Sequence, residues 1–184
     1  VTHWMVPALT WRGRRQIPGM VHVDLQDYPH IEHRCSVQQL SFAADNSCEL
    51  VYASHVLEHF GRYEFMSVLK EWYRVLRTGG VLRLAVPDFA RCAELYYEAG
   101  LADGLSGLLG LICGGQRNEY DFHKMVFDEP FLKQALTEIG FQEVRRWDWH
   151  NTEHSQVDDY SQAYLPHLDK QNGRLMSLNL EAVK

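Results

Sequence analysis

The chain has 184 residues and a formal net charge of −6, and 46% of its residues are hydrophobic while 23% are charged. These fractions are ordinary for a folded globular protein and exclude a largely disordered chain, and the length suits one domain with a sizeable core. An acidic balance argues against a broad nucleic-acid surface, because phosphate binding needs clustered Lys and Arg. We therefore expect a single domain over residues 1–184 and no nucleic-acid partner.

The cysteines and the apolar segments bear on the cellular compartment in which the protein is expected. The four cysteines show neither metal-type pairs nor dense disulfide spacing, so they predict reduced thiols in a cytoplasmic protein. No signal peptide is visible, and the apolar segment Leu101–Gly115 is too short and too rich in glycine to cross a bilayer. We expect a cytoplasmic protein without a membrane partner, and the sequence does not indicate an oligomeric state.

The first half of the chain predicts strands separated by one clear helix. Met20–Asp24 is a short apolar strand, and after a turn the chain extends again at Arg34–Val37. Glu49–Ala53 and Val81–Val86 are two further apolar runs of strand length. Between them, apolar residues recur every three or four positions and predict a helix that Gly79-Gly80 ends. A strand, a helix and a second strand in this order predict a right-handed unit with parallel strands.

The second half predicts two capped helices and two final strands. Asp88 can cap a helix over Phe89–Ala99, with Gly100 beyond its end. Asp128 can cap another helix that has Pro130 in its first turn and ends at Gly140. The last strands are expected at Phe141–Trp149 and Leu175–Val183. The polar segment between them, 150–173, is long enough to suggest a function.

Several phrases of this sequence occur together in one known family. They are Ser54–His59, Glu71–Gly80, Val86–Phe89, Glu119–Met125 and Asp159–Tyr164. The chain resembles class I, Rossmann-like methyltransferases that depend on S-adenosylmethionine, particularly a small bacterial group of the methyltransferase type 11 kind, over residues 17–98 and 116–184. The resemblance implies an α/β fold, a three-layer Rossmann-like sandwich with a mostly parallel central sheet and an antiparallel last strand. It also implies transfer of a methyl group from S-adenosylmethionine to an unidentified small-molecule or saccharide acceptor.

One segment departs from this family. In the family, the first strand runs into a glycine-rich Leu-Gly-Cys-Gly turn that binds the cofactor. This chain has Thr10-Trp11-Arg12-Gly13 at that place and keeps only Gly13 of the cofactor-binding motif. Glycine is needed where the backbone approaches a ligand closely, so Trp11 predicts weakened cofactor binding. Val1–Leu9 also lacks the Lys-Ile-His strand of the family. A catalytically impaired binding module on a methyltransferase fold is therefore an alternative, and a changed start or reading frame would produce the same difference.

Residues at the ends of the predicted strands are the candidates for cofactor binding. Asp24 ends a strand, where a carboxylate can accept hydrogen bonds from both ribose hydroxyls of a nucleoside, although an Asp in this place also forms turns. The resemblance implies that Leu25, Ser36 and Val37 lie around the adenosine. It further implies that Ser54 and His55 lie beside the methionine part of the cofactor.

Other residues are candidates for the reaction itself. His59 and His123 can act as bases near neutral pH, where a methyl acceptor has to lose a proton. Asp88, Tyr120 and Tyr160 lie in loops expected at the same edge of the sheet and are candidates for the acceptor pocket. We expect residues 101–123 and 150–173 to cover that pocket as lids.

His55-x-x-Glu58-His59 permits a second interpretation. It matches the inverted zinc-peptidase pattern, in which two histidines bind Zn²⁺ and the glutamate is the general base of a metallohydrolase. That chemistry requires both histidines on one helix and a third ligand from elsewhere. Because His55 directly follows a predicted strand, the sequence favours a methyltransferase with no metal.

Overall fold

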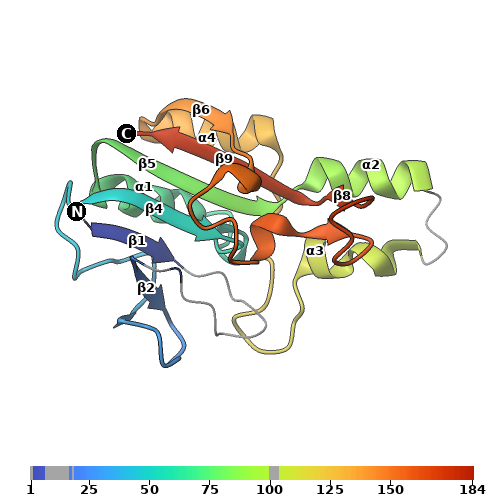
Figure 1. The fold of residues 1–184 in the computed structure, drawn as a ribbon, viewed down its shortest axis with the longest axis horizontal. Helices are drawn as coiled ribbons and strands as arrows, with labels where there is room; N and C mark the ends of the chain where they lie inside the picture. The colour runs from blue at the N-terminus through green and yellow to red at the C-terminus, as the bar shows by residue number, and fades with distance from the viewer. Residues whose placement is uncertain (1, 7–16, 18, 100–103) are drawn as a thin grey trace.

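The computed structural model describes residues 2–6, 17, 19–99 and 104–184 and contains one seven-stranded sheet (Figure 1). The order of its strands is β3-β2-β1-β4-β5-β9-β6, and β9 pairs antiparallel with both of its neighbours while the other pairs are parallel. This confirms the mostly parallel sheet with an antiparallel last strand. The bounds are β1 Thr2–Val6, β2 Met20–Asp24, β3 His33–Arg34, β4 Cys48–Ser54, β5 Leu76–Pro87, β6 Gln142–Arg146 and β9 Ser177–Val183.

The first strand corrects one expectation. Residues 1–9 lack the family's Lys-Ile-His phrase, yet Thr2–Val6 forms β1 in the middle of the sheet, between β2 and β4. A strand that is paired on both sides is held by backbone hydrogen bonds, so a different set of side chains does not prevent it. The following segment, which includes Trp11 and Gly13, lies outside the described residues.

Two helices cover one face of the sheet. α1 (Phe65–Val75) and α4 (Glu129–Ile139) lie together behind the strands in Figure 1. The predicted apolar stripe of α1 is buried, since Val68, Leu69 and Trp72 are inaccessible to solvent. α4 begins at its cap Asp128, whose side chain accepts a hydrogen bond from Phe131 N, and it ends at Gly140, as predicted.

The helix α1 does not end at the glycine pair. It ends at Val75, and the next residue, Leu76, is extended, fully buried and paired with Cys48 of β4. Gly80 lies within β5, where a Cβ atom would be 2.8 Å from the carbonyl oxygen of Arg77 and 3.1 Å from that of Cys48. The glycine thus permits close approach of the β4 and β5 backbones.

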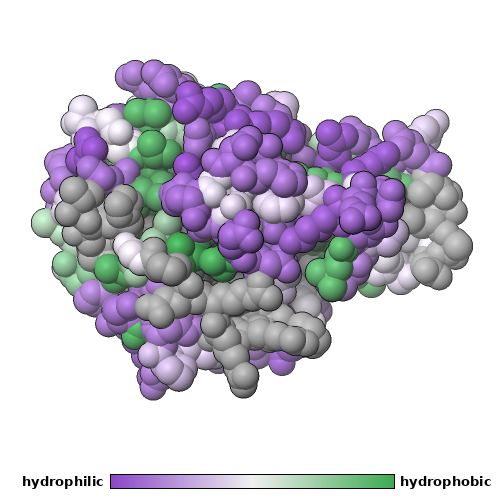
Figure 2. Space-filling view, viewed as in Figure 1, coloured by the Kyte–Doolittle hydropathy of each residue, from purple (hydrophilic) through white to green (hydrophobic). Residues whose placement is uncertain are grey.

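The opposite face of the central strands is covered by the segment that follows β6. Trp147, Trp149 and Val157 pack there against Tyr52 of β4 and Ala85 of β5. The predicted long polar connection is folded into two 3-10 helices and a short hairpin: η3 Trp149–Asn151, η4 Tyr160–Gln162, β7 Tyr164–Leu165 and β8 Arg174–Leu175. Figure 2, in the same view, shows a mainly hydrophilic surface in which hydrophobic side chains form small separate patches.

The remaining helices continue from the carboxyl ends of the strands. η1 (Leu57–His59) follows β4, and α2 (Phe89–Ala99) follows β5 with the predicted bounds. η2 (Gly104–Leu108) and α3 (Leu109–Cys113) then lie beside α2 (Figure 1). None of the helices in the described ranges is long and apolar enough to span a membrane.

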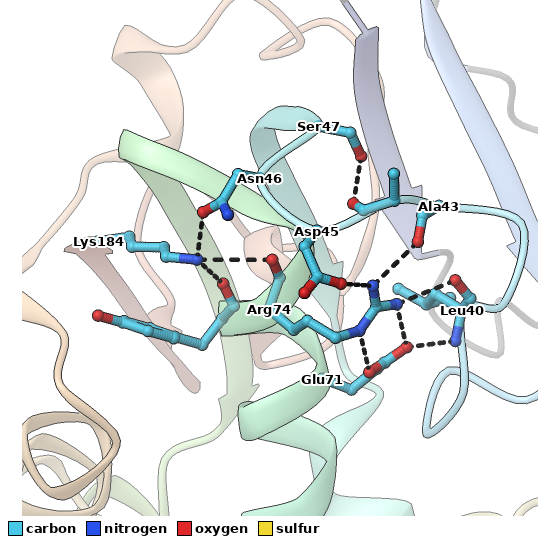
Figure 3. A network of polar contacts seen from close by, with 10 residues as sticks. Leu40, Ala43, Asp45, Asn46, Ser47, Glu71, Arg74 and Lys184 are labelled. Carbon is cyan, nitrogen blue, oxygen red and sulfur yellow. Dashed lines mark hydrogen bonds and ion pairs between the residues drawn. The ribbon is translucent and has the colours of Figure 1, made fainter.

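A polar network fastens the loop between β3 and β4 to α1 (Figure 3). Arg74 donates hydrogen bonds to both carboxylate oxygens of Glu71, at 2.7 and 2.8 Å, and also to Asp45 and to the carbonyl oxygens of Leu40 and Ala43. Glu71 in turn accepts a hydrogen bond from Leu40 N. The Glu-Trp-Tyr-Arg phrase therefore holds a loop in place by a saturated ion pair.

Candidate functional site

Two cavities open at the carboxyl edge of the sheet. The smaller has a volume of about 240 Å³ and lies at the ends of β2 and β3. The larger, about 590 Å³, lies beyond β4 and is bordered by residues of 107–123 and 158–168. Open α/β sheets bind ligands at this edge. Both segments that the sequence predicts as lids thus contribute to the wall of one cavity.

The smaller cavity brings together the residues predicted to contact adenosine. Asp24, Leu25, Ser36 and Val37 line it, and so does Tyr120, which the sequence predicts in the acceptor pocket. Asp24 is the last residue of β2 and is 8% exposed, with one carboxylate oxygen accepting a hydrogen bond from Gln26 N at 2.8 Å. Burial raises the pKa of this carboxyl. A carboxylate acceptor beside apolar side chains fits the ribose and base of a nucleoside, which is the adenosine part of S-adenosylmethionine.

The larger cavity contains the two predicted catalytic histidines, one predicted acceptor residue, and His55, which the sequence predicts beside the methionine part of the cofactor. His55, His59, His123 and Tyr160 all line it, and the rings of His55 and Tyr160 have their centres 5.2 Å apart. His59 lines both cavities. The two cavities therefore share His59 as a wall residue.

A buried carboxylate lies at the centre of these histidines. Glu58 is fully buried in η1, and neither of its oxygens has a hydrogen-bond partner within the described ranges. His55 Nδ1 lies 3.4 Å and His123 Nε2 lies 3.9 Å from Glu58 Oε1. Burial raises the pKa of Glu58 to about 8. Buried polar groups are almost always paired, so an unpaired carboxylate indicates a site for a proton or a ligand.

A chain of hydrogen bonds sets the orientation of His55. Asn179 donates to the carbonyl oxygen of Ser161 and accepts, through its amide oxygen, the hydroxyl hydrogen of Ser177 at 2.8 Å. Ser177 Oγ is then the acceptor for His55 Nε2 at 3.2 Å. The Nδ1 lone pair of His55 consequently faces Glu58. His55 also has a positive φ of 52°, a strained value for a non-glycine residue, and burial lowers its pKa well below the usual value.

His59 and His123 are oriented by backbone carbonyl groups. His59 Nδ1 lies 3.0 Å from the carbonyl oxygen of Phe122, and His123 Nδ1 lies 2.9 Å from that of Leu111. Because a carbonyl oxygen only accepts, each Nδ1 carries the hydrogen and each Nε2 keeps its lone pair. Burial lowers the pKa of both histidines, that of His59 to about 4, so both imidazoles are neutral at physiological pH.

The loop that carries His123 is placed by a glycine and by backbone hydrogen bonds. Gly114 has a φ of 78°, and a Cβ atom there would collide with the carbonyl oxygen of Asp121 and lie 2.9 Å from His123 N. Lys124 N and Met125 N donate to the carbonyl oxygen of Glu58 at 2.8 and 3.1 Å. These contacts bring residue 123 next to η1.

Three other predicted site residues have different surroundings. Ser54 ends β4 and is buried, with a hydroxyl that lacks a partner among the residues described. Asp88 is buried at the start of α2, where one oxygen accepts a hydrogen bond from Arg91 N at 3.3 Å and the other lies 3.6 Å from Arg146. Asp88 is not among the described residues that border either cavity. Gly13 lies outside the described residues.

Sequence reasoning missed several groups of this site. Ser177 and Asn179 are on β9, and Arg117 and Asp121 form an ion pair of 2.6 Å at the edge of the larger cavity. A polar residue at alternate positions of an otherwise apolar final strand was the available signal for Ser177 and Asn179. The ion pair gives no signal beyond a spacing of four residues.

Comparison with known proteins points to one activity. Residues 15–84 match a family model described as a methyltransferase domain; this range is less than half of the chain and contains β2, β3, β4 and most of the smaller cavity's wall. No curated protein sequence matches the chain significantly.

Solved structures share its fold. An S-adenosylmethionine-dependent methyltransferase from Archaeoglobus fulgidus has a TM-score of 0.56 at 12% identity, with all of this chain and 86% of that one covered. A 1,6-didemethyltoxoflavin N1-methyltransferase from Burkholderia thailandensis, solved with bound 1,6-didemethyltoxoflavin and S-adenosylhomocysteine, has a TM-score of 0.56 at 17% identity, with all of this chain and 71% of that one covered. The N-methyltransferase NodS from Bradyrhizobium japonicum, solved with S-adenosylhomocysteine, has a TM-score of 0.52 at 12% identity, with all of this chain and 78% of that one covered.

At these identities the solved structures show the fold alone, and the match to the methyltransferase domain covers residues 15–84. The match and the shared fold together support a methyltransferase.

Proposed function

We propose that this protein transfers the methyl group of S-adenosylmethionine to a polar small molecule, such as a saccharide, that binds in the larger cavity. The observation that carries the proposal is that His59 borders both cavities. The smaller cavity offers Asp24 to a ribose, and the larger one offers hydrogen-bonding groups to an acceptor: Arg117, Asp121, Asp158, Tyr160 and His167.

The residues of the chain have mainly to position the reactants. When bound, the cofactor supplies a methyl group on a sulfonium sulfur, and the transfer is an in-line displacement that depends on alignment. Asp24, Leu25, Ser36 and Val37 would hold the adenosine part. Residues of 107–123 and 158–168 would enclose the acceptor and exclude water. The role of His59 or His123 as the base stays a prediction.

Binding of the cofactor tests the first half of this proposal. Titration calorimetry with S-adenosylmethionine and S-adenosylhomocysteine should show binding to the full chain. Asp24→Ala should weaken it by about 1–3 kcal/mol, because hydrogen bonds to a charged acceptor are lost. Asp27→Ala is the matched control, since Asp27 is exposed and does not border the cavity.

The results separate the enzyme from the impaired binding module. Binding that is equal in the Asp24→Ala variant would contradict the placement of the ribose. A folded chain that binds neither compound would favour the module, and Trp11 would then be the first residue to replace. Methylation of candidate saccharides, followed by mass spectrometry, tests the choice of acceptor.

A further inference from the structure

We propose that Glu58, His59 and His123 bind a divalent transition metal ion at the wall of the larger cavity, and that this ion holds an oxygen atom of the acceptor. One ligand atom from each of the three residues lies within 4.8 Å of the others. The statement about the acceptor rests on the proposed function, whereas the metal site itself does not.

The orientation of the two histidines supports the site. Each Nδ1 hydrogen is directed to a backbone carbonyl group, which leaves each Nε2 lone pair available. Ligating histidines typically donate their other ring hydrogen to a carbonyl or carboxylate, because that bond fixes the ring and makes the ligand more basic.

The carboxylate supplies an independent observation. Glu58 is fully buried and has no hydrogen-bond partner in the described part of the chain, and it faces the lone pair of His55 at 3.4 Å. Two acceptors at this distance need a positive charge or a proton between or beside them. A cation on Glu58 satisfies this requirement and offsets the cost of burying the carboxylate.

The chemistry of the three ligand atoms limits which metal ions suit the site. Two imidazole nitrogens and one carboxylate oxygen suit Zn²⁺, Co²⁺ or Fe²⁺ better than Mg²⁺ or Ca²⁺, which prefer oxygen ligands. Three protein ligands leave coordination positions for water or for an acceptor oxygen, as in catalytic zinc sites. A bound cation lowers the pKa of a coordinated hydroxyl, which suits an oxygen acceptor of a methyl group.

This site differs from the inverted zinc-peptidase pattern. In that pattern His55 and His59 are the ligands and Glu58 is the base, but His55 Nε2 is engaged with Ser177 and His55 is not in the cluster. Here Glu58 is a ligand, and the second imidazole comes from His123. In this inference His59 and His123 are ligands and not bases.

Metal binding to the full, tag-free chain tests the site directly. After treatment with a chelator, the protein is dialysed against Zn²⁺, and its metal content and affinity are measured; Co²⁺ in a parallel sample reports coordination through its visible absorption. We expect one equivalent of Zn²⁺ and a higher melting temperature with the metal. Glu58→Gln, His59→Ala and His123→Gln should each weaken binding by about tenfold or more.

His150→Gln is the control for histidines in general, because His150 is exposed and outside the cluster, and it should bind Zn²⁺ as the wild type does. Circular dichroism of the metal-free variants shows whether each has folded. Absence of stoichiometric binding, or equal affinity in a folded Glu58→Gln variant, would overturn the metal site and leave a shared proton between Glu58 and His55. The two proposals can fail separately, since metal binding needs no cofactor and calorimetry with S-adenosylmethionine needs no metal.

Discussion

Glu58 lies in η1, between β4 and α1, and Glu71 lies within α1; the surroundings of these two acidic side chains are opposite. Glu71 is 14% exposed and receives hydrogen bonds from Arg74 and from Leu40 N (Figure 3). Glu58 is fully buried and has no partner among the described residues, while three imidazoles surround it. A saturated carboxylate stabilises the fold, whereas an unsaturated one lowers stability and is retained for a ligand or a reaction.

Removal of each carboxylate should give the largest contrast. Glu71→Ala should lower the free energy of unfolding by about 2–3 kcal/mol, because charged hydrogen bonds are lost and Arg74 keeps no carboxylate on α1. Urea denaturation measures the change. Glu94→Ala is the control, since Glu94 forms an exposed pair with Arg91 and should cost under about 1 kcal/mol.

The corresponding change at the other carboxyl group should have a much smaller effect. In metal-free protein at pH 7, Glu58→Gln should leave the free energy of unfolding nearly unchanged, because burial raises the pKa of Glu58 to about 8 and the side chain that the amide replaces is then itself largely neutral. The same denaturation assay with a chelator measures it. A loss as large as that of Glu71→Ala would show that Glu58 has a structural role and would remove the contrast.

The loop that carries His123 offers a sharper test. Gly114→Ala should disturb the close contact of the residue 114 backbone with Asp121 and His123, since the position has a positive φ and no space for a Cβ atom. We expect the free energy of unfolding to fall by about 1–2 kcal/mol. Zn²⁺ affinity should fall with it. Gly110→Ala is the control, because nothing lies within 4 Å of a Cβ atom there. Unchanged metal affinity in a folded Gly114→Ala protein would separate the loop from the site.

The pH dependence of stability provides a further comparison. Hydrogen bonds from Arg74 hold the pKa of Glu71 below its usual value of 4.5. The stabilisation is therefore fully present above pH 4.5 and is lost as the pH falls through the lower pKa of the folded state. The free energies of unfolding of the wild type and of Glu71→Gln, measured by denaturation as a function of pH, should converge in acid. A constant difference down to the lowest pH would show that the charge of Glu71 contributes nothing.

Local patterns were enough to predict much of the fold. The bounds of β2, α2 and α4 follow from apolar periodicity and from caps such as Asp128, which act within a few residues. β1 was not predicted, since its pairing with β2 and β4 is a property of the whole sheet. The end of α1 was misplaced because Gly80 serves a close approach between strands.

The candidate site was also predictable only in part, because local patterns do not show contacts between residues far apart in the chain. Asp24 ends β2 and His55 directly follows β4, so their place at one edge followed from topology. The contacts of Glu58 with His123, and of His55 with Ser177, join residues far apart in the chain. No spacing rule connects such residues, and their chemistry appears only in the folded molecule.

The last comparison concerns Asp88, which the sequence predicts in the acceptor pocket and which lies at the start of α2. Asp88→Ala should cost about 1 kcal/mol of stability, as the loss of a helix N-cap does, and should leave the KM for the acceptor unchanged. Asp128→Ala removes the cap of α4 and is the matched control with a similar loss. If Asp88→Ala instead raises the KM for the acceptor while Asp128→Ala does not, Asp88 contacts the acceptor and the pocket reaches beyond the larger cavity to the end of β5.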